Sequence, residues 1–180
     1  MFRRLTPDRQ PDPLQRDLKA LLPRLWRFAY VLSRSRTDAE DLVQATCVRI
    51  LERRHQFTGQ GRFESWAFAV MASVWKNHVR AERIRLGEGH VEAEEVLVFD
   101  GAQSAETNIF FRQVLEQIQD LPEGQRAAVL LVYGEGLSYA EAANALGVPI
   151  GTIMSRLANA RKLLAHLRHD SPEPREPETP

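Results

Sequence analysis

The feature that most constrains the fold is the segment 138–157, SYAEAANALGVPIGTIMSRL. Ser138 and Glu141 have the spacing of a capping box, in which the two side chains satisfy backbone donors at the start of a helix. Gly147 stands where a left-handed residue ends a helix, and Pro149 suits the beginning of a second one. The segment therefore predicts two helices joined by a tight turn, a helix-turn-helix.

Each of these two helices has an apolar face at helical spacing. The inward-facing residues are Ala142, Ala143 and Leu146 in the first helix and Ile153, Leu157, Ala160 and Leu164 in the second. The opposite face of the second helix carries donors suited to phosphates and base edges, namely Thr152, Ser155, Arg156 and Asn159. We therefore predict that this segment contacts DNA, the alternative being an ordinary helical hairpin with a polar surface.

The zero net charge of the chain hides a strong segregation of charge along it. Residues 1–85 hold 17 Lys and Arg against 9 Asp and Glu, whereas residues 86–125 hold 1 against 9. Residues 126–168 are basic again, with 5 against 2. Two basic regions separated by an acidic connector are typical of a protein that binds nucleic acid.

The chain predicts an all-α fold of two small helical domains joined by a flexible acidic linker, the second domain containing the helix-turn-helix. Alternating strand patterns and tight hairpin dipeptides are missing from its 180 residues. The predicted helices cover 13–32, 37–55 with a Thr37–Glu40 capping box, 64–85, 105–120 and 122–133, followed by the helix-turn-helix. The predicted divisions are an N-terminal extension (1–12), a first domain (13–85), the linker (86–104), a second domain (105–169) and a disordered tail (170–180).

Other sequence features narrow the setting and the chemistry. No run reaches the roughly eighteen apolar residues of a membrane span, and the N-terminus differs from a signal peptide. The one cysteine, Cys47, leaves no internal disulfide, is expected to be a small core residue and fits a reducing cytoplasm. We find no phosphate loop, metal-ligand spacing or nucleophile–base pair, so we expect no enzyme activity, no cofactor and no metal.

Two further surfaces carry functional patterns. The predicted helix 37–55 has an inward stripe of Ala39, Leu42, Val43, Thr46, Ile50 and Leu51, and an outward face with Asp38, Asp41, Gln44, Ala45 and Val48. The predicted helix 64–85 has a polar stripe of Ser73, Lys76, Asn77, Arg80 and Arg83, whose cations could neutralise phosphates. Aromatic residues near a basic helix can stack on unpaired bases. We assign Trp66 and Phe68 mainly to packing and favour Phe57 with the glycine loop 57–62 for holding an extruded base.

Three motifs together resemble bacterial RNA polymerase sigma factors of the extracytoplasmic-function type, over about residues 13–168. They are DAEDLVQ at 38–44, FTGQGRFESW at 57–66 with KNHVR at 76–80, and GLSYAEAANALGVPIGTIMSRLANAR at 136–161. The resemblance implies a first domain that binds core RNA polymerase and melts the minus-ten promoter element. It also implies a second domain that reads the minus-thirty-five element.

The resemblance assigns three sets of residues. The polymerase-binding set is Asp38, Glu40, Asp41 and Gln44, to which the outward face adds Val48. The minus-ten set is Phe57, Gly59, Arg62, Lys76, Asn77 and Arg80. The minus-thirty-five set is Thr152, Ser155, Arg156, Asn159 and Arg161. Met154 and Asn159 occupy positions that are often basic in this family, so the resemblance implies an unusual base readout there.

By this resemblance the chain is a dissociable, non-catalytic subunit that directs promoter-specific transcription initiation, and its expected partners are core RNA polymerase, promoter DNA and an anti-sigma factor. One alternative is a stand-alone helix-turn-helix regulator that binds its operator as a dimer. A second is an interaction module that sequesters regulators. The sequence leaves open whether the two domains of the free protein lie apart or packed together.

Overall fold

The computed structural model describes residues 12–86, 118 and 120–169, and all regular structure within these ranges is helical, as predicted. The first half of the chain contains α1 (Pro13–Ser33), α2 (Arg36–Glu52), the short 3-10 turn η1 (Arg54–Gln56) and α3 (Phe63–Leu86). The second half contains α5 (Glu123–Val129), the π turn η2 (Leu130–Gly134), α6 (Tyr139–Leu146) and α7 (Ile150–His169). The predicted linker, tail and N-terminal extension, and most of the predicted helix 105–120, lie outside the described residues.

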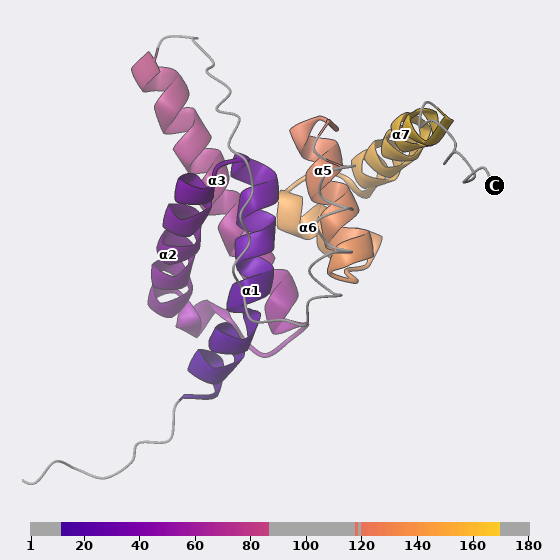
Figure 1. Ribbon diagram of the computed structural model, residues 1–180. Coiled ribbons are helices and arrows are strands. Elements are labelled where there is room, and N and C mark those ends of the chain that lie inside the picture. Colours follow the sequence, from indigo (N-terminus) through magenta and orange to yellow (C-terminus); the bar gives the residue numbers. More distant parts are fainter. Residues whose placement is uncertain (1–11, 87–117, 119, 170–180) are drawn as a thin grey trace, which may run out of the picture.

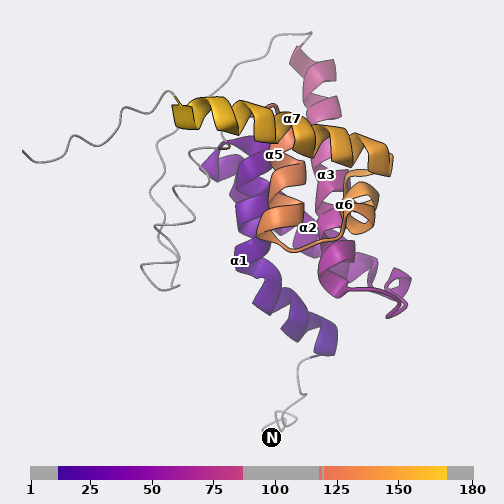
Figure 2. The same cartoon turned by 90° about the vertical axis from the view of Figure 1, so that its right-hand side faces the viewer.

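The helices are stacked in layers from one side of the molecule to the other. α2 lies on one side against α1 and α3, which in turn contact α5 and α6, and α7 covers the far side of α5 and α6 (Figures 1 and 2). The two halves are therefore packed against each other. None of the described helices combines the length and the apolar character needed to cross a membrane.

The first half is held by an apolar core between α1, α2 and α3. The rings of Phe28 and Phe68 meet edge to face with centroids 5.3 Å apart, and both side chains are fully buried. This confirms Phe68 as a packing residue. Asp12 caps the start of α1 by accepting from the backbone N–H of Leu14 at 3.2 Å, and Arg34 ends α1 in the left-handed region with φ of 58°.

The start and end of α2 differ from the prediction. Its N-cap is Ser35, whose hydroxyl accepts from the backbone N–H of Asp38 at 3.3 Å. The predicted Thr37–Glu40 capping box is therefore wrong, and Glu40 pairs instead with Arg36 at 3.1 Å. Ser35 serves as the cap because it follows the left-handed end of α1 with an extended backbone, so the helix can begin two residues earlier.

The buried stripe of α2 is narrower than predicted. Ala39, Leu42, Thr46 and Ile50 are buried, Val43 and Cys47 are half-buried, but Leu51 is 42% exposed. The helix also ends at Glu52 and gives way to η1 rather than continuing to residue 55. Burial raises the pKa of the Cys47 thiol, which favours the neutral form and agrees with its expected role as a packing residue.

The helix-turn-helix has the predicted local geometry. The Ser138 hydroxyl accepts from the backbone N–H of Glu141 at 3.2 Å, and the Glu141 carboxylate accepts from the backbone N–H of Ser138 at 2.8 Å. Gly147 ends α6 in the left-handed region with φ of 60°. The inward residues of both helices are buried, except Leu164, which is half-buried. Local sequence signals therefore identified this motif correctly.

The predicted helix 122–133 is two elements. α5 ends at Val129, and the chain then widens into the π turn η2, after which the backbone N–H of Glu135 donates to the carbonyl of Leu130 at 2.8 Å. The backbone N–H of Leu137 donates to the carbonyl of Leu131 at 2.9 Å. Such π turns often occur at functional sites. Here the turn is followed by Glu135, which lies against α1.

The Ser138–Glu141 cap generates a test of the helix-turn-helix. The backbone N–H of Ser138, and then its hydroxyl, hold the pKa of Glu141 below its ordinary value. Ser138→Ala should lower the free energy of unfolding at pH 7 by about 1 kcal/mol. It should also raise the pKa of Glu141 toward its ordinary value of about 4.3, as measured by NMR titration.

Because the pKa of Glu141 is depressed in the folded chain, its stabilising effect is present at neutral pH and is lost as the pH falls through the folded pKa. The difference between the variant and the unaltered chain should therefore shrink in acid. Ser73→Ala, at an exposed position inside α3, is the matched control and should leave the unfolding free energy nearly unchanged. Equal losses for both variants at every pH would contradict this account of the cap.

Candidate nucleic-acid interface

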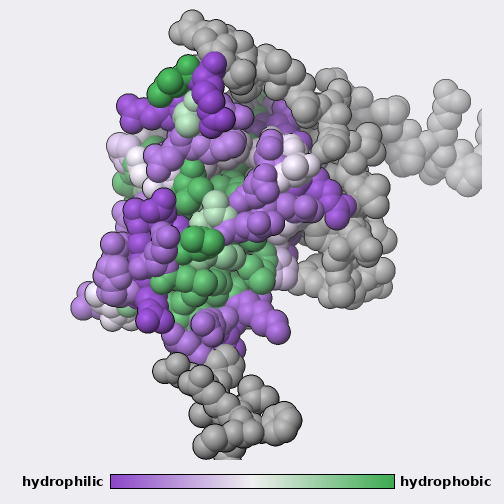
Figure 3. All heavy atoms as spheres, turned by 90° about the vertical axis from the view of Figure 1, so that its left-hand side faces the viewer, coloured by the Kyte–Doolittle hydropathy of each residue, from purple (hydrophilic) through white to green (hydrophobic). Residues whose placement is uncertain are grey.

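The outer surface of α2 is open. Asp38, Glu40, Asp41, Gln44 and Val48 are all exposed, and α2 contacts the rest of the molecule through its opposite face. Val48 is 56% exposed, so the surface has an apolar residue among acidic and amide ones. Figure 3 views this side of the molecule and shows hydrophobic atoms gathered at its centre with hydrophilic atoms around them.

The glycine loop between η1 and α3 is exposed, but the aromatic ring next to it is largely packed against other rings. The ring of Phe57 is half-buried and packs on those of Phe63 and Trp66, with centroids 5.5 and 5.4 Å away. Gly59 and Gly61 have φ of 75° and 88°, and a Cβ at either position would meet open space. Backbone conformation, rather than crowding, therefore requires glycine in this loop.

Phe57 and Trp66 thus belong to one aromatic cluster. The sequence predicts mainly packing for Trp66 and base binding for Phe57, but the structure brings both into the same packed group. The loop itself is solvent-facing, because residues 58–62 are all exposed. An extruded base held here would therefore lie between the loop backbone and the edge of this cluster.

Two cations of the minus-ten set are occupied by the second half of the chain. The amino group of Lys76 donates to the carbonyl of Leu146 at the end of α6, and Arg62 Nη1 donates to the carbonyl of Gly136 at 3.1 Å. Next to Lys76, the indole N–H of Trp75 donates to Glu123 at 3.0 Å. Asn77 and Arg80, farther along α3, are exposed.

The second helix of the helix-turn-helix, α7, lies on the side of the second half away from α1 and α3 (Figure 2). Ser155, Asn159 and Arg161 are exposed, whereas Thr152 and Arg156 are half-buried. Ser155 donates its hydroxyl proton to the carbonyl of Thr152 at 3.0 Å, and Arg161 Nε donates to that of Leu157 at 3.4 Å. All five predicted residues therefore lie on one helix, but they differ in how freely they can reach a ligand.

Arg156 is positioned by the neighbouring helix α5. Its guanidinium lies so close to Gly124 that a Cβ at that residue would be 2.8 Å from Arg156 Cζ. Because Gly124 has no side chain, the guanidinium can occupy the space beside it. Arg156 therefore packs against the start of α5, a contact that the sequence did not indicate.

Sequence reasoning also missed the charged residues buried between the two halves. Glu135 accepts from Arg24 Nε at 2.5 Å and from Arg27 Nη2 at 3.2 Å. The buried Arg126 donates from Nε to the carbonyl of Val31 at 3.2 Å and from Nη1 to that of Leu121 at 2.7 Å. Glu135 stands between two glycines, which indicates a turn, but nothing local indicates partners more than 100 residues away.

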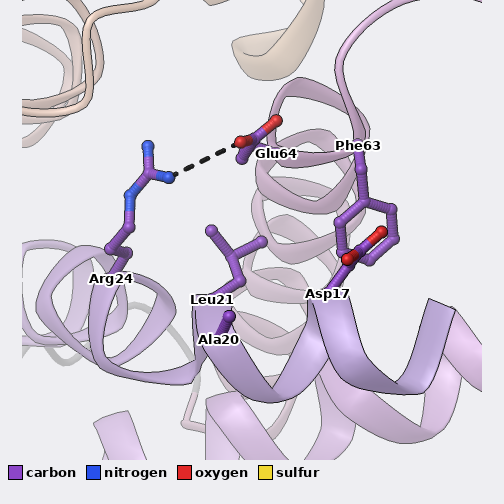
Figure 4. Close-up of a pocket in the computed structure, with 6 residues that line it drawn as sticks. All are labelled: Asp17, Ala20, Leu21, Arg24, Phe63 and Glu64. Carbon is purple, nitrogen blue, oxygen red and sulfur yellow. Dashed lines mark ion pairs between the residues drawn. The ribbon is translucent and has the colours of Figure 1, made fainter. Parts of the chain in front are cut away.

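A hollow of about 300 Å³ lies beside this buried group, between α1 and the start of α3 (Figure 4). It is lined by Asp17, Ala20, Leu21, Arg24, Phe63 and Glu64, and Arg24 pairs with Glu64 across it at 3.8 Å. The charged groups of the hollow are two carboxylates and one guanidinium. This excess of negative charge disfavours phosphate binding, and none of the lining residues is an activated nucleophile. Among the described residues, His, Cys, Asp and Glu form no group that could hold a metal ion.

Two protein-family models match successive parts of the chain, and each part contains surfaces described above. The model for Sigma-70 region 2 matches residues 18–84, which contain the α2 surface, the glycine loop and the stripe of α3. The model for Sigma-70, region 4 matches residues 111–164, which contain the helix-turn-helix.

Similar proteins are extracytoplasmic-function (ECF) sigma factors. The ECF RNA polymerase sigma factor EcfG of Rhodopseudomonas palustris (strain TIE-1) is 32% identical over 156 residues, which are 87% of this chain and 85% of that one. The ECF RNA polymerase sigma factor SigC of Mycobacterium tuberculosis (strain CDC 1551 / Oshkosh) is 36% identical over 84% of this chain and 80% of that one.

A solved structure extends the likeness to three dimensions. The sigma factor RpoE from Bartonella quintana, solved in complex with the anti-sigma factor NepR, superposes with a TM-score of 0.71 at 28% identity, covering 88% of this chain and 98% of that one. With both family models, these relatives and this fold in agreement, the chain belongs to the ECF sigma factors of RNA polymerase.

Proposed function

We propose that this sigma factor binds core RNA polymerase through the outer surface of α2 and reads a promoter through two separate surfaces, the glycine loop with α3 and the exposed face of α7. The observation that carries the proposal is the position of the α2 surface. All five polymerase-binding candidates are exposed on it, on the side of the molecule opposite α7. One chain can therefore contact an enzyme on one side and DNA on others.

The chemistry of the α2 surface fits a protein partner. Val48 and its apolar neighbours give it a centre that loses water on contact, and Asp38, Glu40 and Asp41 give it a charged rim. This division into an apolar core and a polar rim is common in protein interfaces. The acidic rim would also favour approach to a basic partner surface.

The surface formed by the glycine loop and α3 fits an opened DNA strand. Arg62, Lys76 and Arg80 supply cations for backbone phosphates, and Asn77 supplies both a donor and an acceptor. Taking a base out of the stack costs a few kcal/mol, which contacts with the loop and the aromatic cluster would offset. We assign Phe57 and Gly59 to this base-holding surface and the polar stripe to the strand next to it.

The exposed face of α7 fits the major groove of duplex DNA. In helix-turn-helix proteins the second helix lies in that groove, with its first turns nearest the base edges. Ser155 and Asn159 are exposed on α7, and the guanidinium of Arg156 packs against α5. We assign Arg156 in the second turn and Asn159 in the third to base readout, and Thr152, Ser155 and Arg161 mainly to the DNA backbone.

The two DNA surfaces act as one reader because they share a chain. We propose that they belong to domains spanning 13–85 and 105–169, which residues 86–104 connect. Tethering makes the second contact intramolecular, so two weak surfaces can give one strong attachment. A protein of this kind works where polymerase and DNA are, in the cytoplasm.

We also propose control by an anti-sigma factor. The similar sigma factor of Bartonella quintana was solved with such a partner, and it superposes on 88% of this chain, so the likeness includes both packed halves. A partner that binds the packed form would keep the two DNA surfaces from separating. This assignment rests on the likeness between the two packed arrangements.

The assignment of α2 leads to a transcription test. Asp41→Asn combined with Gln44→Ala should raise the concentration of chain that half-saturates core polymerase about tenfold or more, because both exposed groups would lie in the contact. The measurement is promoter-directed transcript yield from core polymerase titrated with the full chain. Glu52→Gln, at an exposed position near the end of the same helix, should leave the titration unchanged. A normal titration for the double variant would contradict the assignment.

The assignment of α7 leads to a separate test of DNA readout. Asn159→Ala should reduce discrimination at one base pair of the minus-thirty-five element by about 1–3 kcal/mol, because the amide can pair with a base edge. Arg161→Ala should weaken promoter binding evenly across sequences and lower the salt slope by about one, as expected for a lost phosphate contact. Both effects are measured as affinities of the polymerase complex for single-base promoter variants. Uniform weakening by Asn159→Ala would remove it from base readout.

A further inference from the structure

The two halves of the chain meet around one buried carboxylate. The side chain of Glu135 is only 1% exposed and lies against α1, where Arg24 and Arg27 approach its two oxygens at 2.5 and 3.2 Å. Arg24 also donates from Nη2 to the Glu135 backbone carbonyl at 3.3 Å. The π turn η2 directly precedes Glu135 and directs it into this position.

The contact of Glu135 with Arg24 and Arg27 requires a defined geometry but adds little net free energy to the packing of the two halves. A carboxylate removed from water is costly unless it is paired, and two guanidinium groups here satisfy both of its oxygens. When the halves separate, water can solvate all three charges. Breaking this contact therefore costs less free energy than exposing an apolar contact of equal area. A contact of this kind can hold the chain in one arrangement and still release it.

Closure also engages cations that the chain needs for DNA. Arg62 donates to the carbonyl of Gly136, the residue after Glu135. Lys76 donates to the carbonyl of Leu146, where the negative end of the α6 dipole favours a cation. While these hydrogen bonds are present, neither Arg62 nor Lys76 has all of its donors available for a phosphate. Each contact lies within one chain and needs no partner.

The packed arrangement cannot span a promoter. The minus-ten and minus-thirty-five elements are separated by about 25 base pairs, which is about 85 Å of duplex at about 3.4 Å per base pair. In the packed chain α3 contacts α6, and α7 begins four residues after Leu146. Only the layer of α5 and α6, one helix diameter of roughly 10–12 Å, lies between α3 and α7. The surfaces for the two elements are therefore much closer together than the elements themselves, and both elements can be read only after the halves separate.

Resting on the function proposed above, we propose that Glu135, Arg24 and Arg27 form a latch with which the chain holds itself closed. The latch keeps Arg62 and Lys76 against the second half, and its opening precedes recognition of the complete promoter. An anti-sigma factor would then act on a chain that already closes by itself.

The direct test is the size of the full chain in solution. Glu135→Gln keeps the shape of the side chain but removes its charge, leaving Arg24 and Arg27 opposite a neutral amide. We expect the open fraction to rise about tenfold or more and the radius of gyration from X-ray scattering to increase. Glu64→Gln is the matched control, because it removes a carboxylate whose partners, Arg24 and Arg62, both lie in the first half. That variant should stay as compact as the unaltered chain.

The same variants test the consequence for transcription. With core polymerase and promoter, Glu135→Gln should reach half-maximal transcription at a several-fold lower chain concentration, and Glu64→Gln should match the unaltered chain. Circular dichroism verifies that helix content is retained. Arg27→Gln, which removes the latch from the other side, should repeat both results and replaces Glu135→Gln if that variant loses helix content.

The outcomes separate the latch from the proposed function. Latch variants as compact as the unaltered chain, an equal expansion by Glu64→Gln, or expansion with no gain in transcription would each overturn the latch. Failure of the unaltered chain to direct any transcription would instead overturn the proposed function, and the scattering result would still report on closure.

Discussion

The buried contact of Glu135 with Arg24 and Arg27 is the interaction on which the observed arrangement depends. It joins residues more than 100 positions apart and places a charge where it is tolerated only with both partners present. The buried Arg126 supports the same junction by donating to the carbonyl of Val31 on α1 and that of Leu121 before α5. These charged groups therefore all find partners at the junction, which fixes the relative position of the halves more sharply than apolar packing alone.

The proposed binding surfaces differ in how accessible they are in the packed chain. The outer surface of α2 lies across the first half from α5, α6 and α7, so it is exposed while the halves are packed (Figure 1). Arg62 and Lys76, by contrast, face the second half and donate to its backbone carbonyls. The proposed polymerase surface on α2 is therefore accessible in the packed chain, whereas Arg62 and Lys76 of the proposed minus-ten surface are engaged by the second half. Under the proposed function, closure would thus separate polymerase recruitment from promoter reading.

Local signals in the sequence predicted most of the helices, because caps and apolar spacing act over a few residues. Ser138, Glu141 and Gly147 were sufficient to define the helix-turn-helix, and the exposure of its polar face followed from the same periodicity. The start of α2 was wrong because Ser35 and Thr37 both offer a capping hydroxyl, and only the left-handed end of α1 decides between them.

What the sequence could not supply is the junction between the halves. Residues such as Lys76 and Arg62 were assigned from their charge, yet the carbonyl groups that they meet come from a turn and a helix end about 70 residues later. The partners of Glu135 are equally remote in sequence. Backbone carbonyls occur at every residue and carry no sequence signal, so only the folded chain shows which of them a cation reaches.

The central claim, that the two halves pack together in the free chain and separate on a promoter, is tested most directly by energy transfer between dyes on the exposed surfaces of α2 and α7. Transfer should be efficient in the free full-length chain and should fall sharply when core polymerase and a promoter with both elements are added. Efficient transfer that persists in a complex actively making transcript would contradict the account.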